Sequence, residues 1–148
     1  MKKTILAFFL SLSVVNIAIA QSEASSTFPC YLQFNKGSCW QGYQVDLQII
    51  DEISGEVITS IRLSKEEFQQ QQSFPCRPEQ ELRFKATFSP AIWEKGQDQW
   101  YDAKRVVFVP SMSMAEGKKA WLLKRCFHHD FLSVPLPTQG DVGRCACE

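Results

Sequence analysis

Apolar and polar residues alternate through much of the chain with the period of two that is typical of half-buried β-strands. The first clear example covers residues 43–51, where apolar side chains share one face and glutamine and aspartate share the other. A turn around Gly55 follows, and residues 57–63 are again rich in β-branched side chains. The pattern predicts that these two segments form an antiparallel hairpin.

Three further segments have the alternation or the composition of strands. They are residues 82–88, 101–109 and 118–127. In the last of them, Leu123 and Arg125 fall on the same face. Each segment ends near a proline, a glycine or a polar cluster, which predicts a turn.

Residues 64–72 carry the signature of a helix start. Ser64 is followed three residues later by Glu67, which is the spacing of a capping box. We therefore expect one or two helical turns that run into the four glutamines at 69–72. The glutamine run is interpreted as a solvated linker.

The order of these elements predicts the fold class. Strands follow one another without long intervening helices, so we do not expect a parallel sheet with crossover helices. We expect a mainly all-β protein: a small, disulfide-linked, antiparallel β-sandwich, immunoglobulin-like in outline, with at most one short helix. A small barrel is the alternative. Residues 28–148 are predicted to form a single domain.

The first 20 residues have the features of an export signal. Two lysines precede a mostly apolar stretch, and Ala18 and Ala20 are small residues at the two positions that a leader peptidase recognises. The stretch is shorter than the roughly 20 residues of a spanning helix. We expect cleavage before Gln21, a flexible mature N-terminus at 21–27 and no membrane span in the mature form. The short basic start is typical of bacteria and predicts a periplasmic or secreted protein.

Six cysteines follow the predicted signal. They are Cys30, Cys39, Cys76, Cys126, Cys145 and Cys147. An even number in an exported chain predicts structural disulfides. Cys145 and Cys147 are too close for an unstrained bridge, so we expect them to have separate partners. Cys30 and Cys39 flank a short loop and could pair, and the sequence leaves the other pairings open.

Charge narrows the range of partners. The chain has 16 basic and 16 acidic residues, and removal of the signal leaves a mild acidic excess. This balance gives no support to a nucleic-acid partner. The basic pairs at 104–105, 118–119 and 124–125 could form a patch, which we interpret as part of an ordinary mixed surface.

Residues suited to catalysis are few, so we expect a non-enzymatic protein without a cofactor. The two histidines are His128 and His129, and the acidic residues are scattered through turns. One alternative is a periplasmic copper-binding protein. Met112 and Met114 would supply thioethers and the histidines imidazoles, which together suit copper.

A segment rich in tryptophan offers the candidate binding residues. Trp93, Trp100 and Tyr101 lie in or beside a polar stretch, and such side chains dominate contacts between proteins. We therefore predict an exported binding module for a protein partner in the bacterial envelope or in a secretion or surface assembly. A carbohydrate-binding module that stacks sugars on Trp93 and Trp100 is the second alternative.

Overall fold

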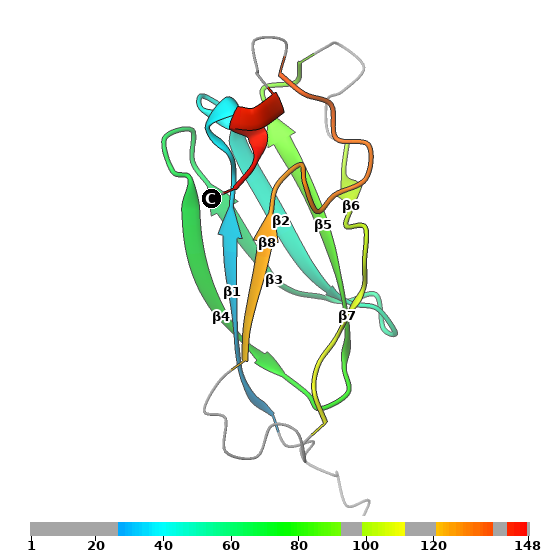
Figure 1. Cartoon of the computed structure of the whole chain (residues 1–148). Helices are drawn as coiled ribbons and strands as arrows, with labels where there is room; N and C mark the ends of the chain where they lie inside the picture. Colours follow the sequence, from blue (N-terminus) through cyan, green and yellow to red (C-terminus); the bar gives the residue numbers. More distant parts are fainter. Residues whose placement is uncertain (1–26, 93–98, 112–120, 138–141, 148) are drawn as a thin grey trace, which may run out of the picture.

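Two β-sheets pack against each other in the computed structural model, which describes residues 27–92, 99–111, 121–137 and 142–147 (Figure 1). One sheet has the order β4-β1-β8. Its strands are β1 (Phe28–Asn35), β4 (Gln69–Cys76) and β8 (Trp121–Cys126). The other has the order β3-β2-β5-β6, with β7 also paired to β5. Its strands are β2 (Gln44–Asp51), β3 (Val57–Leu63), β5 (Glu81–Ser89), β6 (Tyr101–Asp102) and β7 (Val107–Phe108). Two short 3-10 turns, η1 (Ser38–Trp40) and η3 (Val142–Cys145), complete the described chain.

Alternation places the core between the sheets. On β5 and on β2 as far as Ile49, every second side chain is buried, as a strand with one covered face requires. The fully buried set includes Val45, Leu47, Leu82 and Phe84 from one sheet and Leu32 and Phe34 from the other. At one end of the sandwich the ring of Trp40 lies 4.6 Å from that of Phe127 and 5.0 Å from that of Phe88, measured between centroids.

The predicted fold class is confirmed as a mainly β, disulfide-linked pair of sheets. The predicted hairpin is present, because β2 and β3 pair antiparallel, and β5 occupies the segment predicted at 82–88. One pairing departs from the antiparallel expectation, since β1 runs parallel to β8. The second and third strands share a sheet here, whereas they lie in opposite sheets of an immunoglobulin domain. The likeness to that domain is therefore one of outline.

The helical turns predicted at 64–72 are wrong. Residues 65–66 form a turn between the sheets, and the glutamines belong to β4, which pairs antiparallel with β1. Half of the capping box does form, because the Ser64 amide donates to the Glu67 carboxylate at 2.9 Å. It closes the turn instead of starting a helix. The ladder to β1 holds the glutamines in an extended conformation, which overrides their helix propensity.

Two of the remaining strand predictions hold over shorter ranges. The segment predicted at 101–109 contains β6 and β7, with an interruption at 103–106. Within the segment predicted at 118–127, β8 covers Trp121–Cys126. Residues 118–120, the predicted signal and nearly all of the predicted flexible N-terminus lie outside the described residues.

All six cysteines are paired. The disulfides are Cys30–Cys76, Cys39–Cys145 and Cys126–Cys147. Separate partners for Cys145 and Cys147 are confirmed, and the suggested Cys30–Cys39 bridge is wrong. Strand β1 carries the chain roughly 16 Å from Cys30 before it turns, at about 3.3 Å per residue. A disulfide requires Cα atoms within about 7 Å, so the two cannot meet.

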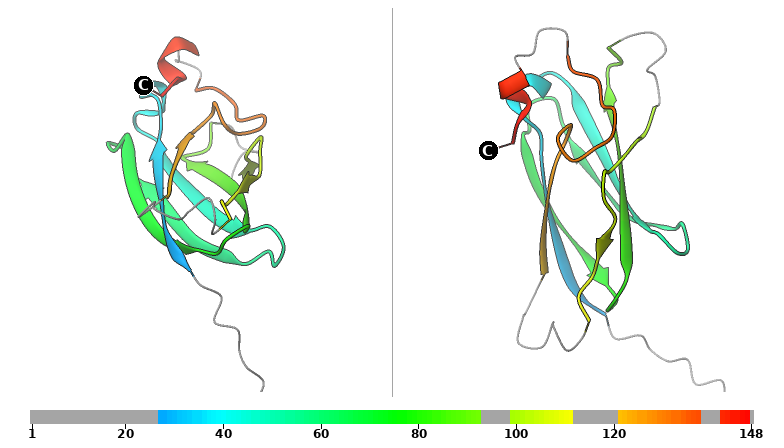
Figure 2. Two further views of the ribbon diagram at one scale, coloured as in Figure 1. Left: turned by 60° about the horizontal axis from the view of Figure 1, so that its bottom comes forward. Right: turned by 45° about the vertical axis from the view of Figure 1, so that its right-hand side comes forward.

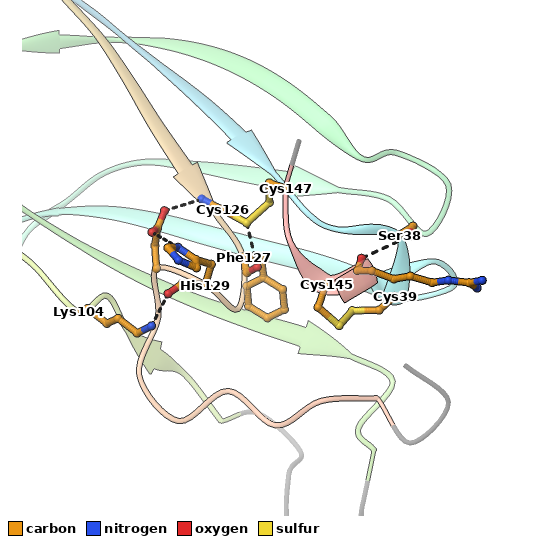
Figure 3. The surroundings of a disulfide bond; sticks show 10 residues. Ser38, Cys39, Lys104, Cys126, Phe127, His129, Cys145 and Cys147 are labelled. Carbon is orange, nitrogen blue, oxygen red and sulfur yellow. Dashed lines mark hydrogen bonds and ion pairs between the residues drawn. A yellow bond between two sulfur atoms is a disulfide. The ribbon is translucent and has the colours of Figure 1, made fainter. Parts of the chain in front are cut away.

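The C-terminal segment docks closely on the turn after β1, as Figure 3 shows. A Cβ atom on Gly37 would lie 2.5 Å from the backbone carbon of Cys145 and 2.6 Å from the oxygen of Arg144. Glycine is therefore the residue that permits this approach. The Ser38 hydroxyl donates to the Arg144 carbonyl at 3.3 Å, beside the Cys39–Cys145 bridge.

A buried lysine connects several segments at the same end of the sandwich by hydrogen bonds. Lys36 is 3% exposed, and its ammonium group donates to the backbone carbonyls of Tyr43 at 2.6 Å, Ser64 at 2.7 Å and Lys65 at 3.2 Å. Burial lowers the pKa of Lys36. With its three donors occupied, this lysine has a structural role, joining β1 to the turns before β2 and after β3.

A buried aspartate closes the other end of β2. One carboxylate oxygen of Asp51 accepts from the amides of Ile53 at 3.1 Å and Ser54 at 2.9 Å. The other accepts from Gln80 Nε2 at 2.7 Å and Arg77 Nη2 at 2.6 Å. These bonds, led by the Ser54 amide, hold the pKa of Asp51 well below its usual range.

Replacement of this carboxylate should destabilise the fold. Asp51→Ala is expected to lower the free energy of unfolding by at least about 2 kcal/mol, because four donors lose a charged acceptor. Asp46→Ala is the matched control on the same strand, since Asp46 pairs with the exposed Arg62 and should cost much less. Urea denaturation measures both. Equal losses in the two variants would contradict the structural role of Asp51.

The same group predicts how stability depends on pH. The pKa of Asp51 is lower in the folded state than in the unfolded state, so its stabilisation is complete above the unfolded pKa of about 3.9. It is lost as the pH falls towards the folded pKa. The difference in unfolding free energy between wild type and Asp51→Asn should be constant from pH 7 to pH 5 and shrink below pH 4. A difference that stays constant down to pH 2 would rule this out.

Candidate functional site

The open side of the sandwich, where β8 faces the chain that follows β6, carries the candidate site (Figure 2). The chain after β8 folds across to β6 and is fixed there by backbone contacts. Ala103 and Phe131 form a β-bridge, the Lys104 amide donates to the Asp130 carbonyl at 2.8 Å, and the Leu132 amide donates to the Asp102 carbonyl at 2.8 Å. Segments that are more than 20 residues apart in sequence therefore form one surface.

A cationic hollow of about 320 Å³ lies on this side, lined by Lys104, Arg105, Arg125, His129 and Asp130. Three of these residues are permanently cationic near neutral pH and one is an acid. The chain between β6 and β7 supplies Lys104 and Arg105, β8 supplies Arg125, and the turn after β8 supplies the other two.

Arg125 is the most enclosed of the cations. It lies on the inward-facing side of β8, and its guanidinium carbon is 4.8 Å from the centre of the Phe84 ring. Its Nη1 donates to the Lys124 carbonyl at 3.0 Å. Its Nε is enclosed and has no hydrogen-bond partner among the described residues. Burial lowers the pKa of Arg125, and the charge of Asp130 opposes that shift.

The carboxylate of the hollow is already engaged in the turn after β8. One oxygen of Asp130 accepts from the Cys126 amide at 2.7 Å, and the other lies 2.9 Å from His129 Nδ1. The Lys104 ammonium group donates to the His129 carbonyl, as Figure 3 shows beside the Cys126–Cys147 disulfide. These contacts hold the turn in place and leave an excess of positive charge around the hollow.

The predicted metal ligands are only partly within the described chain. His129 is exposed and contacts Asp130, whereas His128 is partly buried. Burial, together with the charges of Lys104 and His129, lowers the pKa of His128. Within the described ranges, no cluster of three histidine, cysteine or acidic residues could hold a metal, and Met112 and Met114 lie outside those ranges. Because every cysteine is bridged, none offers a thiolate.

Of the three predicted aromatic contact residues, Trp100 and Tyr101 are described, and they have different surroundings. Trp100 is 38% exposed. Tyr101 is 4% exposed and stacks on Phe88 with the ring centres 5.9 Å apart, so it belongs to the core. Neighbouring residues of a strand face opposite sides, so the side chain of Tyr101 points into the sandwich while that of Trp100 points outwards. Trp93 lies outside the described residues.

Exposed apolar side chains accompany the cations on this side of the molecule. Trp100 and Val106 lie before and after the basic pair at 104–105 in the sequence, and Leu132, 50% exposed, lies on the adjoining segment. We call the exposed residues of segments 100–106 and 128–132 the edge surface. It combines an aromatic residue, aliphatic residues and positive charge with one exposed acid, Asp102, which lies 3.7 Å from Lys85 and 4.0 Å from Arg83.

Sequence reasoning noted these basic pairs and interpreted them as ordinary surface. The structure separates their members, because Arg125 points towards the core side of β8 and Lys124 is exposed. It then brings Arg125 to Lys104 and Arg105 from the other sheet. The sequence feature that could have indicated the site is Arg125, a charged residue on the apolar face of the predicted strand at 118–127.

The chain matches no protein-family model, no curated protein and no solved structure. In the part of the chain that the structure describes, no helix is long and apolar enough to cross a bilayer.

Removal of the Tyr101 hydroxyl tests its assignment to the core. This hydroxyl is enclosed and has no hydrogen-bond partner among the described residues, and burial raises its pKa. Tyr101→Phe should therefore leave the free energy of unfolding within about 0.5 kcal/mol of wild type or increase it. Tyr101→Ala should lower it by about 3 kcal/mol or more, because the ring contacts are lost. Thermal denaturation distinguishes these results from a polar role, in which Tyr101→Phe would be clearly destabilising.

Proposed function

We propose that this protein is an exported, non-enzymatic binding module whose edge surface contacts an acidic segment of a protein partner. The partner would belong to the bacterial envelope or to a secretion or surface assembly. The mature protein would begin at Gln21, after removal of the signal, and would act in the periplasm or outside the cell.

The composition of the edge surface carries this proposal. Trp100, Val106 and Leu132 are all at least 37% exposed, and they lie on the same two segments as Lys104 and Arg105. Aromatic and aliphatic side chains mixed with arginine are typical of contact surfaces between proteins. The positive charge favours an acidic partner, because opposite charges steer the encounter and reject wrong partners.

The rigidity of the scaffold supports the same conclusion. Backbone hydrogen bonds attach both segments of the edge surface to each other, and Cys126–Cys147 anchors the end of β8 next to them. A surface that is ordered before binding loses less conformational entropy when it binds. Three disulfides are compatible with a secreted protein, because such bonds persist in oxidising compartments.

The two alternatives depend on other residues. Copper binding would use Met112 and Met114, and sugar stacking would use Trp93 with Trp100. Each therefore needs residues outside the described ranges, whereas every member of the edge surface is described.

Site-specific photocrosslinking in the producing cell tests the proposal. A photoreactive amino acid at Leu132 should give one discrete adduct with a second protein, because this side chain is exposed on the edge surface. The same amino acid at Ile53, which is 83% exposed at the far end of β2, is the positional control and should give none. Mass spectrometry of the adduct identifies the partner and the mature N-terminus.

Charge reversal completes the test. Arg105→Glu should reduce the yield of the Leu132 adduct, because it replaces attraction for an acidic segment with repulsion. Lys65→Glu makes the same change of charge at the exposed turn after β3 and should leave the yield unchanged. Adducts of equal yield at both photoreactive positions, or an equal loss in both charge variants, would contradict the proposal.

A further inference from the structure

The cationic hollow has the size and the charge for one small anionic group. Its volume of about 320 Å³ exceeds what a single carboxylate or phosphate group requires, and its cations come from β8 and from the chain between β6 and β7. Lys104, Arg105 and Arg125 therefore approach one space from two directions. A flat basic surface, which attracts polyanions along its length, has no such convergence.

Two of the cations are held in place before any ligand arrives. The guanidinium group of Arg125 is stacked on Phe84 and bonded to the Lys124 carbonyl. The ammonium group of Lys104 is bonded to the His129 carbonyl. A guanidinium group fixed in its plane is suited to an oxyanion, because its donors match the spacing of two oxygen atoms.

Among the described residues, the one acid that lines the hollow, Asp130, makes no direct ion pair with its cations. The carboxylate of Asp130 is bonded to the Cys126 amide and contacts His129, and no ion pair within 4.0 Å joins it to Arg125, Lys104 or Arg105 in the described chain. A partly desolvated cation without a paired anion is costly, and an incoming anion would relieve that cost. By contrast, three other arginines of the fold have carboxylate partners, in the pairs Arg62–Asp46, Arg77–Asp51 and Arg83–Glu52.

We infer that the hollow is a binding site for a single oxyanion group, with Arg125 as the orienting residue and Lys104 and Arg105 as its electrostatic partners. This inference rests on the proposed function, because the acidic segment of the partner would present a side-chain carboxylate to the hollow. The shared chemistry extends to phosphate, so the test has to separate the two anions.

A titration of the oxidised full-length protein, followed by two-dimensional ¹H–¹⁵N NMR, tests the site. Sodium acetate and inorganic phosphate are the two probes, each exchanged against chloride at constant ionic strength. We expect saturable shifts of the Arg125 Nε–H resonance and of the amides of Lys104, Arg105 and His129, in the millimolar range. Tighter binding of acetate favours a protein carboxylate as the natural group. Tighter binding of phosphate overturns the carboxylate assignment.

Matched variants link the signal to the hollow. Arg105→Gln should weaken binding by about three- to tenfold, because one partly exposed cation is removed. Arg125→Lys keeps the charge but loses the planar donors and should weaken binding at least as much. Lys65→Gln removes a cation at the turn after β3 and should leave the affinity unchanged. Linear shifts without saturation, or the same affinity in Arg105→Gln as in wild type, would overturn the site.

The two experiments can fail separately. Loss of the Leu132 adduct with intact, saturable anion binding would contradict the protein-binding proposal and leave the oxyanion site standing. A specific adduct in a protein that shows no saturable anion binding would overturn the oxyanion site and leave the edge surface standing.

Discussion

The parallel pairing of β8 with β1 decides which side chains of β8 enter the sandwich. The register runs from Cys30 opposite Trp121 to Asn35 opposite Cys126, and the next amide, that of Phe127, donates to the Asn35 carbonyl at 2.8 Å. A slip of one residue would reverse the two faces of β8. Arg125 would then point to solvent and leave Phe84, so the hollow exists only in the observed register.

Much of the fold could be predicted from the sequence wherever one face of a strand is apolar and the other polar. The hairpin of β2 and β3 and the strand β5 have that pattern, because their inner faces are buried and their outer faces are wet. Strand β4 was missed because Gln69–Gln72 carry no apolar alternation, and their strand character comes from the ladder to β1. In β1 the alternation of Leu32 and Phe34 is present, but a proline and a cysteine at its start conceal it.

The candidate site was less predictable, because its residues meet through tertiary contacts. The alternation in β8 gives the direction of Arg125, but no local pattern places Lys104 beside it from the other sheet. Burial also separates charges that look alike in the sequence. Lys36 and Asp51 are satisfied by hydrogen bonds and close the two ends of β2, whereas the cations of the hollow are held in position without a paired acid. That contrast distinguishes a structural charge from one available to a ligand.

The positions of the cysteines along the chain impose an order of maturation. Cys30 and Cys76 both precede β5, but the other two bridges wait for Cys145 and Cys147, which follow every strand of the sandwich. A chain that enters an oxidising compartment N-terminus first therefore delivers both complete sheets before these two bridges can close. Until then, Cys39 and Cys126 are thiols without their native partners. In such a chain the strands of both sheets are available to pack before the last two crosslinks form.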